Sequence, residues 1–348
     1  MVRNRMTWLP AGWLREMKRD RPQAAAEAKG VRPATSAFSV MVQKEFSDHI
    51  RSWRFGILLA IISLACIGSL YSAMTALLDN SSSQAGDNGF LFLSIFTLSD
   101  GTLPNFIAFV TFLGPLMGIA LGFDAVNVER NRGTLSRLIS QPIYRDDFLK
   151  AKFVASLLLI TVVIVALGLL VMGLGLIVIG FPPTLEEFIR VVLFLMAAIV
   201  YIAFWLNLSL LLSVRFRQAA TSALSGISLW IFFSVFYSMI LNLLARALAP
   251  ANTADTGAVL AFQQMMLGLN RLSPAELFNE ATTTLLMPAV RALGPLTMEQ
   301  LVGALPSPLP LGQSLLLVWP QLTGLIAATM VCFGLSYYLF MRQEIRSR

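Results

Sequence analysis

Charged, turn-forming and aliphatic residues that could bind another protein are concentrated between residues 124 and 152. This stretch holds six basic and four acidic residues, with Leu135, Leu138 and Ile139 on one side of a predicted short helix. Gly133 and Pro142 break the backbone at its two ends. A compact amphipathic helix of this kind suits insertion into a groove on a partner protein, and it suits lying on lipid headgroups equally well. Composition alone leaves both alternatives open.

Catalytic chemistry has few candidate residues in this chain. His49 is the only histidine, so a metal or catalytic site that needs two imidazoles is excluded. Cys66 and Cys332 lie far apart inside apolar stretches and form no CxxC motif. No GxxxxGK[ST] sequence is present to bind nucleotide phosphates. We therefore expect no catalytic residue, no metal and no cofactor on this chain.

Apolar runs dominate the composition and predict the fold class. The 348 residues are 56% hydrophobic and only 13% charged, whereas soluble domains carry about 25% charged residues. Six stretches of 20 or more residues contain no charge: 55–78, 101–123, 153–185, 191–214, 218–245 and 300–341. Each can cross a bilayer, which requires about 20 apolar residues. The expected fold is all-α, a polytopic membrane protein with six transmembrane helices, and a soluble enzyme or a secreted disulfide-rich protein is excluded.

The expected spans take up the apolar part of each stretch. They are 55–76, 105–123, 153–180, 190–212, 219–245 and 313–341. Their strongest polar groups are Asn207, Asn242 and Gln321, and no carboxylate or ammonium lies in mid-span. Ion-coupled carriers place ionisable groups at this depth. The energy for any transport is therefore expected to come from outside this chain.

The distribution of Lys and Arg predicts the orientation of the spans. With the N-terminus inside, the cytoplasmic segments 1–54, 124–152, 214–218 and 342–348 hold 22 of the 26 basic residues. Basic loops are retained on the cytoplasmic side, so both termini are expected in the cytoplasm. The expected location of the protein is the plasma (inner) membrane. The same asymmetry explains the basic composition through contact with an anionic lipid surface, and no nucleic-acid partner is implied.

The N-terminal part divides into two segments before the first span. Residues 1–35 are basic and rich in Ala and Pro, which is typical of a mobile cytoplasmic arm. Within 36–54, apolar residues recur at helical spacing and charged residues occupy the opposite side of the helix. The apolar residues are Phe38, Val42, Phe46, Ile50 and Trp53. The charged residues are Lys44, Glu45, Asp48 and Arg51. The segment is predicted to be an interfacial amphipathic helix or an ordinary helix before the span without a partner.

Two further features concern the transmembrane domain, residues 55–341. Gly114, Gly118 and Gly122 in the second span are four residues apart, and such a stripe predicts close packing against another helix. The segment 250–312 is expected to be an external helical loop. Its first helix is expected to begin at Ser273-Pro274-Ala275-Glu276, a sequence typical of an N-cap, a proline at the first helical position and a capping-box glutamate. Its second helix is expected to begin near 297–300.

Three segments resemble the permease subunits of ABC transporters of the ABC-2 type. The first is Glu129-Arg130-x-x-Gly133-Thr134-Leu135-x-x-Leu138-x-Ser140-x-Pro142-Ile143-x-Arg145, followed by Lys152. The second is Lys44-Glu45-Phe46, with Arg51, Arg54 and Phe55 after it, and the third is Ser273-Pro274-Ala275-Glu276-Leu277-Phe278. The likeness covers about residues 37–346 and includes six spans in the expected order. It departs at Ala151, where the family often has Gly, and in the long arm and the long 250–312 segment.

The resemblance implies a fold, partners and roles for particular residues. The fold would be that of an ABC-2 permease, similar to type V exporters, in which two permease subunits pair and each rests on a separate ATPase subunit. The segment 124–152 would carry a coupling helix that fits a cleft on the ATPase. The residues carried over to this contact are Glu129, Arg130, Gly133, Thr134, Leu135, Leu138, Pro142 and Arg145. Those carried over to the interfacial helix are Lys44, Glu45, Phe46, Arg51 and Arg54.

The expected function is therefore the permease subunit of an ATP-driven transporter, in keeping with a family that mostly exports. A membrane scaffold that recruits a cytosolic protein through the same helix, without transport, is the alternative. The expected partners are an ABC ATPase subunit, a second permease subunit (identical or different) and the lipid bilayer. The substrate is not predicted, because apolar walls with scattered Ser, Thr and Asn suit many molecules.

Overall fold

The structure is a computed structural model that describes residues 37–80, 90–134, 145–249, 256–288 and 309–342. All regular secondary structure in these residues is helical. Six helical segments are long and apolar enough to span a membrane: α3 (Trp53–Asn80), α5 (Phe106–Gly122), α8 (Arg145–Ile179), α9 (Leu185–Arg215), α10 to α11 (Ala219–Leu248) and α15 (Leu311–Arg342). The predicted all-α fold with six spans is confirmed.

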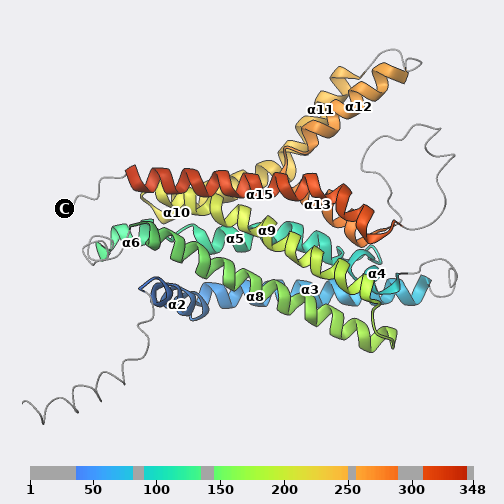
Figure 1. The fold of residues 1–348 in the computed structure, drawn as a ribbon, viewed down its shortest axis with the longest axis horizontal. Helices are drawn as coiled ribbons and strands as arrows, with labels where there is room; N and C mark the ends of the chain where they lie inside the picture. Colours follow the sequence, from blue (N-terminus) through green and yellow to red (C-terminus); the bar gives the residue numbers. More distant parts are fainter. Residues whose placement is uncertain (1–36, 81–89, 135–144, 250–255, 289–308, 343–348) are drawn as a thin grey trace, which may run out of the picture.

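The spanning helices lie side by side along one axis, and α9 occupies the centre (Figure 1). α9 contacts α5, α8, α10, α13 (Pro274–Leu286) and α15. Two-thirds of its apolar window is buried inside the chain, a larger share than in any other span. Helices of this kind satisfy their backbone hydrogen bonds internally, which the hydrocarbon core of a bilayer requires.

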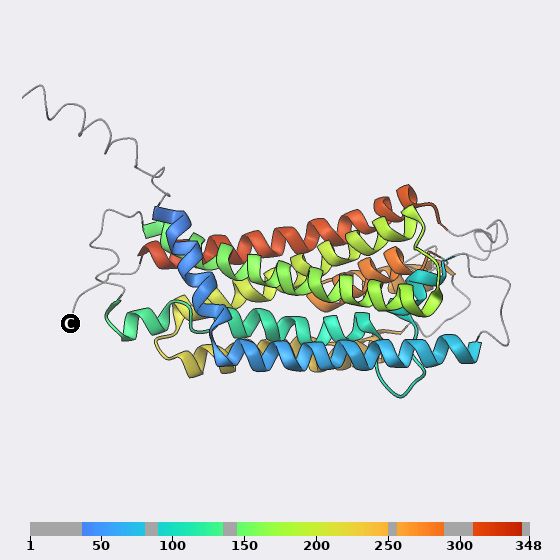
Figure 2. The same ribbon diagram turned by 90° about the horizontal axis from the view of Figure 1, so that it is seen from below.

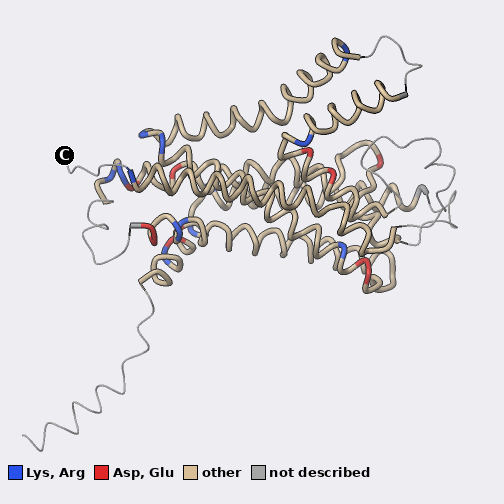
Figure 3. The backbone as a smooth tube through the Cα atoms, turned by 45° about the horizontal axis from the view of Figure 1, so that its top comes forward, with Lys and Arg blue, Asp and Glu red and all other residues tan. Residues whose placement is uncertain are grey.

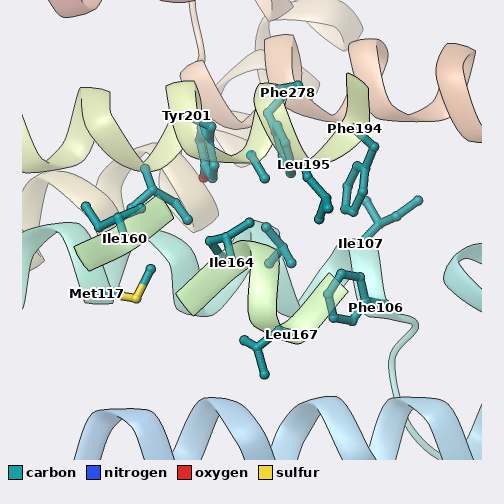
Figure 4. Packing of buried hydrophobic residues seen from close by; sticks show 14 of the residues in the cluster. Phe106, Ile107, Met117, Ile160, Ile164, Leu167, Phe194, Leu195, Tyr201 and Phe278 are labelled. Atoms are coloured by element: carbon teal, nitrogen blue, oxygen red, sulfur yellow. The ribbon is translucent and has the colours of Figure 1, made fainter. Parts of the chain in front are cut away.

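Aromatic side chains fill the core where α9 meets its neighbours (Figure 4). Phe194 on α9 makes edge contacts with Phe106 of α5 and with Phe96 of the short helix α4 (Leu91–Thr97), both with ring centroids 6.0 Å apart. Tyr201, two turns further along α9, stacks on Phe278 of α13 with centroids 4.6 Å apart. Each buried ring removes a large apolar area from solvent, and pairs with this geometry add a further favourable contact. The core therefore joins α4, α5, α9 and α13 into one packed unit.

The helix α9 begins at Leu185, five residues before the start predicted from charge. A capping box explains the difference, because the Thr184 hydroxyl accepts from the backbone N–H of Glu187 and the Glu187 carboxylate accepts from that of Thr184. Arg190, predicted at the outer edge of the span, consequently lies inside the helix and is fully buried.

Arg190 is held by polar groups of three other segments. Its guanidinium donates to Glu186 one turn earlier at 2.8 Å, to the carbonyls of Leu285 and Leu309, and to the Ser314 hydroxyl. Burial of a charge is costly unless it is paired and hydrogen-bonded, and this arginine meets both conditions. It fixes the ends of α9, α13 and α15 to one another.

The glycine stripe of α5 packs directly against α9. A Cβ atom added to Gly118 would lie 2.8 Å from the carbonyl oxygen of Ile202 and 2.9 Å from the backbone nitrogen of Leu206. At Gly114 and Gly122 it would lie 2.9 Å from side-chain atoms of α9. The two backbones approach so closely that no side chain fits between them, which is the arrangement that small residues four apart permit.

The first described helix, α2 (Ala37–Ile50), runs across the bundle and is followed by a break at residues 51 and 52 (Figure 2). α2 packs against the start of α8. Phe38, Met41, Val42 and Phe46 turn partly inward, whereas Ile50 and Trp53 of the predicted apolar face are exposed. α2 therefore packs against its own bundle, and its location at the membrane interface stays a prediction.

The fifth span is not the single α-helix expected for residues 219–245. A turn of π-helix, η2 (Phe232–Phe236), separates α10 (Ala219–Ile231) from α11 (Tyr237–Leu248). Beyond η2 the chain leaves the bundle, and α11 forms a projecting hairpin with α12 (Thr256–Asn270), a helix that the sequence did not predict (Figure 1). A π-turn inside a span breaks the regular i to i−4 bonding and permits this change of direction.

The segment 250–312, which the sequence predicts to be external, contains one of its two predicted helices within the described residues. α13 begins after Ser273 with Pro274 at its first turn, and it buries Phe278, Ala281 and Leu285. The capping box was wrong in one respect, because the Ser273 side chain makes no capping hydrogen bond. The second predicted helix, near 297–300, lies outside the described residues, as do the arm 1–35 and the tail 343–348.

Substitution Gly118→Ala should destabilise the protein, because its methyl group would meet the α9 backbone. We expect a loss of about 2 kcal/mol and a lower melting temperature in detergent. Gly173→Ala in α8 is the matched control, since a Cβ at that position meets nothing within 4 Å, and it should be neutral or slightly stabilising. Equal melting temperatures for the two variants would contradict the close α5–α9 contact.

Candidate functional site

A dense group of Lys, Arg, Asp and Glu lies at the end of the bundle where α2, α6 (Asn127–Asn131) and the start of α8 meet (Figure 3). We call Lys44, Glu45, Glu129 and Lys152 the α2–α6–α8 cluster. Its residues come from three elements that are distant in sequence, and it includes the residues that carry the sequence motifs.

Lys152 is the centre of this cluster. Its side chain is only 6% exposed, and its ammonium lies 2.8 Å from the Glu45 carboxylate of α2 and 3.8 Å from the Glu129 carboxylate of α6. Glu45 and Glu129 are 13% and 17% exposed. The ring of Phe148, one turn earlier on α8, lies 5.0 Å from the same ammonium. One buried cation therefore joins the interfacial helix and the loop after the second span to the third span.

Lys44 extends the cluster toward solvent. Its ammonium is 3.4 Å from Glu45, 3.5 Å from Asp48 and 3.9 Å from Glu129. The Lys44 side chain is more than half exposed, so these pairs contribute much less than the pairs of Lys152. Two cations and two buried carboxylates balance one another here.

The pKa values of the cluster follow from its burial and charge. Burial opposes ionisation of Glu45, but Lys152, with its direct hydrogen bond, and Lys44 together lower the pKa of Glu45 below its ordinary value. His49 lies one turn after Glu45 on α2, and burial lowers the pKa of its imidazole. The His49 ring lies 3.2 Å from the Ser156 hydroxyl. The folded state therefore holds Glu45 ionised and His49 neutral, and acidification from neutral pH weakens the attachment of α2 to α8.

α6 is fixed to the end of α9 by hydrogen bonds. The backbone N–H groups of Val126 and Asn127 donate to the buried Ser213 hydroxyl at 3.0 and 3.3 Å. The Asn131 side chain donates to the carbonyl of Arg217, just after α9, at 2.9 Å. α6 thus has contacts to α9 in addition to the ion pairs to α2 and α8, and a displacement of α6 would be transmitted to all three.

The residues after α6 form a tight turn. Gly133 adopts a φ of +69°, a left-handed conformation that glycine accepts without strain. The Thr134 hydroxyl donates to the Glu129 carbonyl at 3.1 Å and to the Glu129 carboxylate. The Glu-x-x-x-Gly-Thr spacing of the motif therefore serves to close this turn back on Glu129.

A further ion pair joins the first turn of α3 to the loop before α6. Arg54 lies 2.6 Å from Asp124, and its guanidinium is 5.5 Å from the ring centroid of Phe123. Arg54 is largely exposed, so this pair contributes little by itself. Phe46 packs against the main hydrophobic core, and Arg51 is exposed.

Five of the eight residues predicted for the ATPase contact have a described position. Glu129, Gly133 and Thr134 are brought together in the turn, Arg130 is half-buried on α6, and Arg145 is the first residue of α8. Leu135, Leu138 and Pro142 lie outside the described residues. The predicted coupling helix is therefore described only at its first turns.

The role of Glu45 was missed by the sequence analysis, which placed it on the polar side of α2. The structure turns it inward against Lys152, a contact between residues 107 positions apart. A signal was present, because Lys152 stands immediately before the charge-free run that begins at 153. A lysine at the edge of a span needs an acidic partner when it is buried, but the sequence alone does not identify that partner.

Chemically, this arrangement consists of ion pairs and hydrogen bonds that connect α2, α6, α8 and α9. Within the described parts of the chain, no set of three His, Cys, Asp or Glu side chains could hold a metal ion. Carboxylates here are occupied by cations and by hydrogen bonds. The site joins helices that cross the membrane to a turn that projects beyond it.

Comparison with known proteins agrees with this geometry. The profile of the family described as ABC-2 family transporter protein matches residues 40–345, which includes the cluster and all six spans. The chain belongs to the ABC-2 transporter family. It is thus a multi-pass membrane protein and a transporter permease subunit, as the motifs around Glu129 and Lys44 predicted.

Two curated relatives are named Probable ABC transporter permease protein NosY. The protein from Pseudomonas aeruginosa is 26% identical over 206 residues, which cover 58% of this chain and 68% of the relative. The protein from Stutzerimonas stutzeri is 32% identical over 130 residues, which cover 37% of this chain and 42% of the relative. Both relatives carry the permease designation that the family implies.

Replacement of Lys152 by Met should release α2 from the bundle, because it leaves two carboxylates without their buried cation. We expect the free energy of local opening of α2 to fall by about 2 kcal/mol or more, seen as faster amide hydrogen exchange in residues 37–50. Lys150→Met is the matched control, since Lys150 pairs with Asp146 on the surface and its loss should change exchange by less than about 0.5 kcal/mol. The same exchange rate in both variants would be evidence against the cluster.

Proposed function

We propose that this chain is the transmembrane half of an ABC exporter whose motion is driven by ATP bound and hydrolysed on a separate ATPase subunit. The ATPase would contact α6 and the turn after it, which lie at one end of the bundle. The proposal includes a second permease subunit, identical or different, and places the protein in the plasma (inner) membrane. Substrate binding and ATP hydrolysis would then reside on different chains.

The observation that carries this proposal is the position of Lys152. A push on Glu129 from outside the membrane acts through Lys152 on α8 and through Glu45 on α2. The Ser213 contacts carry the same displacement to α9, which is the central helix. Two-state changes of helix packing driven by a partner require a rigid connection of this kind.

Charge supports placing the α2–α6 end in the cytoplasm. This end carries Lys44, Arg54, Arg130 and Lys152, whereas the opposite end exposes Asp100 and Glu186. Basic residues are retained on the cytoplasmic side during insertion. The ATPase, which needs cytoplasmic ATP, would then meet α6 on the correct side.

Coupling is tested by co-expressing the chain with the candidate ATPase and measuring both co-purification and ATP hydrolysis in proteoliposomes. Glu129→Ala and Gly133→Val should reduce the permease-dependent ATPase rate by about tenfold while leaving membrane insertion intact. The first removes the contact to Lys152, and the second forces a β-branched residue into a φ of +69°.

Gly173→Ala serves as the control for this experiment and should hydrolyse ATP at the wild-type rate. Amide hydrogen exchange in residues 37–50 shows whether a variant has also lost the attachment of α2 to the bundle. Unchanged coupling in both variants would contradict the assigned role of α6. Wild-type chain that binds a cytosolic protein without nucleotide hydrolysis would instead favour the scaffold alternative.

Orientation is tested by cysteine labelling after Cys66 and Cys332 are replaced by Ser. Thr102 and Asn131 are both exposed and lie at opposite ends of the bundle. A membrane-impermeant maleimide should label Thr102→Cys in intact cells and Asn131→Cys only after permeabilisation. The reverse pattern would overturn the cytoplasmic placement of α6.

A further inference from the structure

A cavity of about 270 Å³, lined by both polar and apolar groups, lies between the second span, the π-turn of the fifth span and the start of α13. It is on the opposite side of the core from the α2–α6–α8 cluster and takes no part in the proposed coupling. Drug-sized ligands occupy cavities of about 300–1,000 Å³, so this one suits a smaller molecule. Its polar lining is made by Thr111, Ser234, Tyr237, Ser238, Asn270, Ser273, Glu276 and Asn279.

The charge and ring content of the lining define the chemistry it would accept. Glu276 is its only ionisable acid, and no Lys, Arg or His lines it. Three aromatic residues, Phe112, Phe233 and Tyr237, complete the wall. A carboxylate together with aromatic rings and without a basic side chain favours an organic cation, which gains both charge attraction and cation–π contact.

Ser273 contributes a buried hydroxyl to the wall of the cavity. Its side chain is 99% buried, since only 1% of the residue is exposed, and its hydroxyl oxygen has no hydrogen-bond partner in the part of the chain that the structure describes. Ser273 precedes α13 but does not cap it. A buried hydroxyl without a partner costs free energy, and a donor within the cavity would remove this cost.

Glu276 has no ion-pair partner among the described residues. The nearest basic residue in sequence, Arg271, is occupied, because it lies 2.9 Å from Glu280, which also accepts from Gln321. Burial and the neighbouring Glu280 raise the pKa of Glu276 above its ordinary value. The half-buried Glu276 carboxylate therefore lies beside another acid, and its negative charge is not balanced by a cation among the described residues.

An anion fits this cavity less well. The N-terminus of α13 carries a partial positive charge, but Glu276 stands in its first turn and more than offsets it. Asn279 also presents an oxygen, which accepts from the Thr111 hydroxyl at 3.0 Å. A neutral polyol would satisfy Ser273 but would leave the Glu276 charge unpaired.

We propose that this cavity binds a small organic ammonium ion, either a free amine or the headgroup of a lipid, with its charge on Glu276 and a donor group on Ser273. This site is an addition to the permease function and does not depend on it, because binding requires neither ATP nor the ATPase.

The test uses tritiated choline and the full-length chain in nanodiscs of phosphatidylglycerol, which has no ammonium headgroup. We expect saturable binding that tetramethylammonium displaces and that glycerol or inorganic phosphate at the same concentration does not. Glu276→Gln should weaken binding by about tenfold or more, and Ser273→Ala by about threefold. Asp48→Asn, which removes an exposed carboxylate at the other end of the protein, should bind choline as the wild type does.

The source of the ammonium group is distinguished by the lipid. Nanodiscs of phosphatidylethanolamine should lower choline binding if the headgroup occupies the cavity, and should leave it unchanged if the ligand is a free amine. Melting temperatures show whether each variant is folded. If Glu276→Gln does not fold, the proposal is tested by whether tetramethylammonium, but not glycerol or phosphate, displaces choline from the wild type. Absence of saturable choline binding, equal displacement by glycerol, or undiminished binding by folded Glu276→Gln would overturn the proposal.

Discussion

Lys152 and its two carboxylates hold together the end of the bundle where α2, α6 and α8 meet. The three groups come from α8, α2 and α6, and each alone would be unfavourable so close to the membrane. Together they fix a helix that crosses the bundle, a turn that projects from it and the span between them. Since α6 is also bonded to Ser213, the cluster connects α2, α6, α8 and α9 at this end of the bundle.

Arg190 has the corresponding role at the opposite end. It joins the ends of α9, α13 and α15 through one guanidinium that is completely buried. Between Lys152 and Arg190 the contacts are almost entirely apolar, with the α5 glycines pressed against α9 and aromatic rings around Phe194. α5 and α9 are therefore expected to move as a rigid pair, because their backbones leave no space for relative shifts.

The fifth span contrasts with this rigid core. Only 11% of its apolar window is buried within the chain, compared with 67% for α9. Lipid or a second permease must cover what remains. Its π-turn also borders the cavity described above, together with α5 and α13. A segment with few internal contacts can change position at low cost.

Sequence by itself determined the number of spans, the close contact made by Gly114, Gly118 and Gly122, and the family motif around Glu129. These features are local, since a charge-free run of 20 residues or a repeat of four residues has the same meaning in any surroundings. Tertiary structure decided the partners of buried charges and the path of the fifth span. Glu45 and Lys152 are 107 residues apart, and Arg190 is bonded to residues more than 90 positions away. The local pattern does not identify the partners of these charges, because only the packing of other helices brings them together and removes them from water.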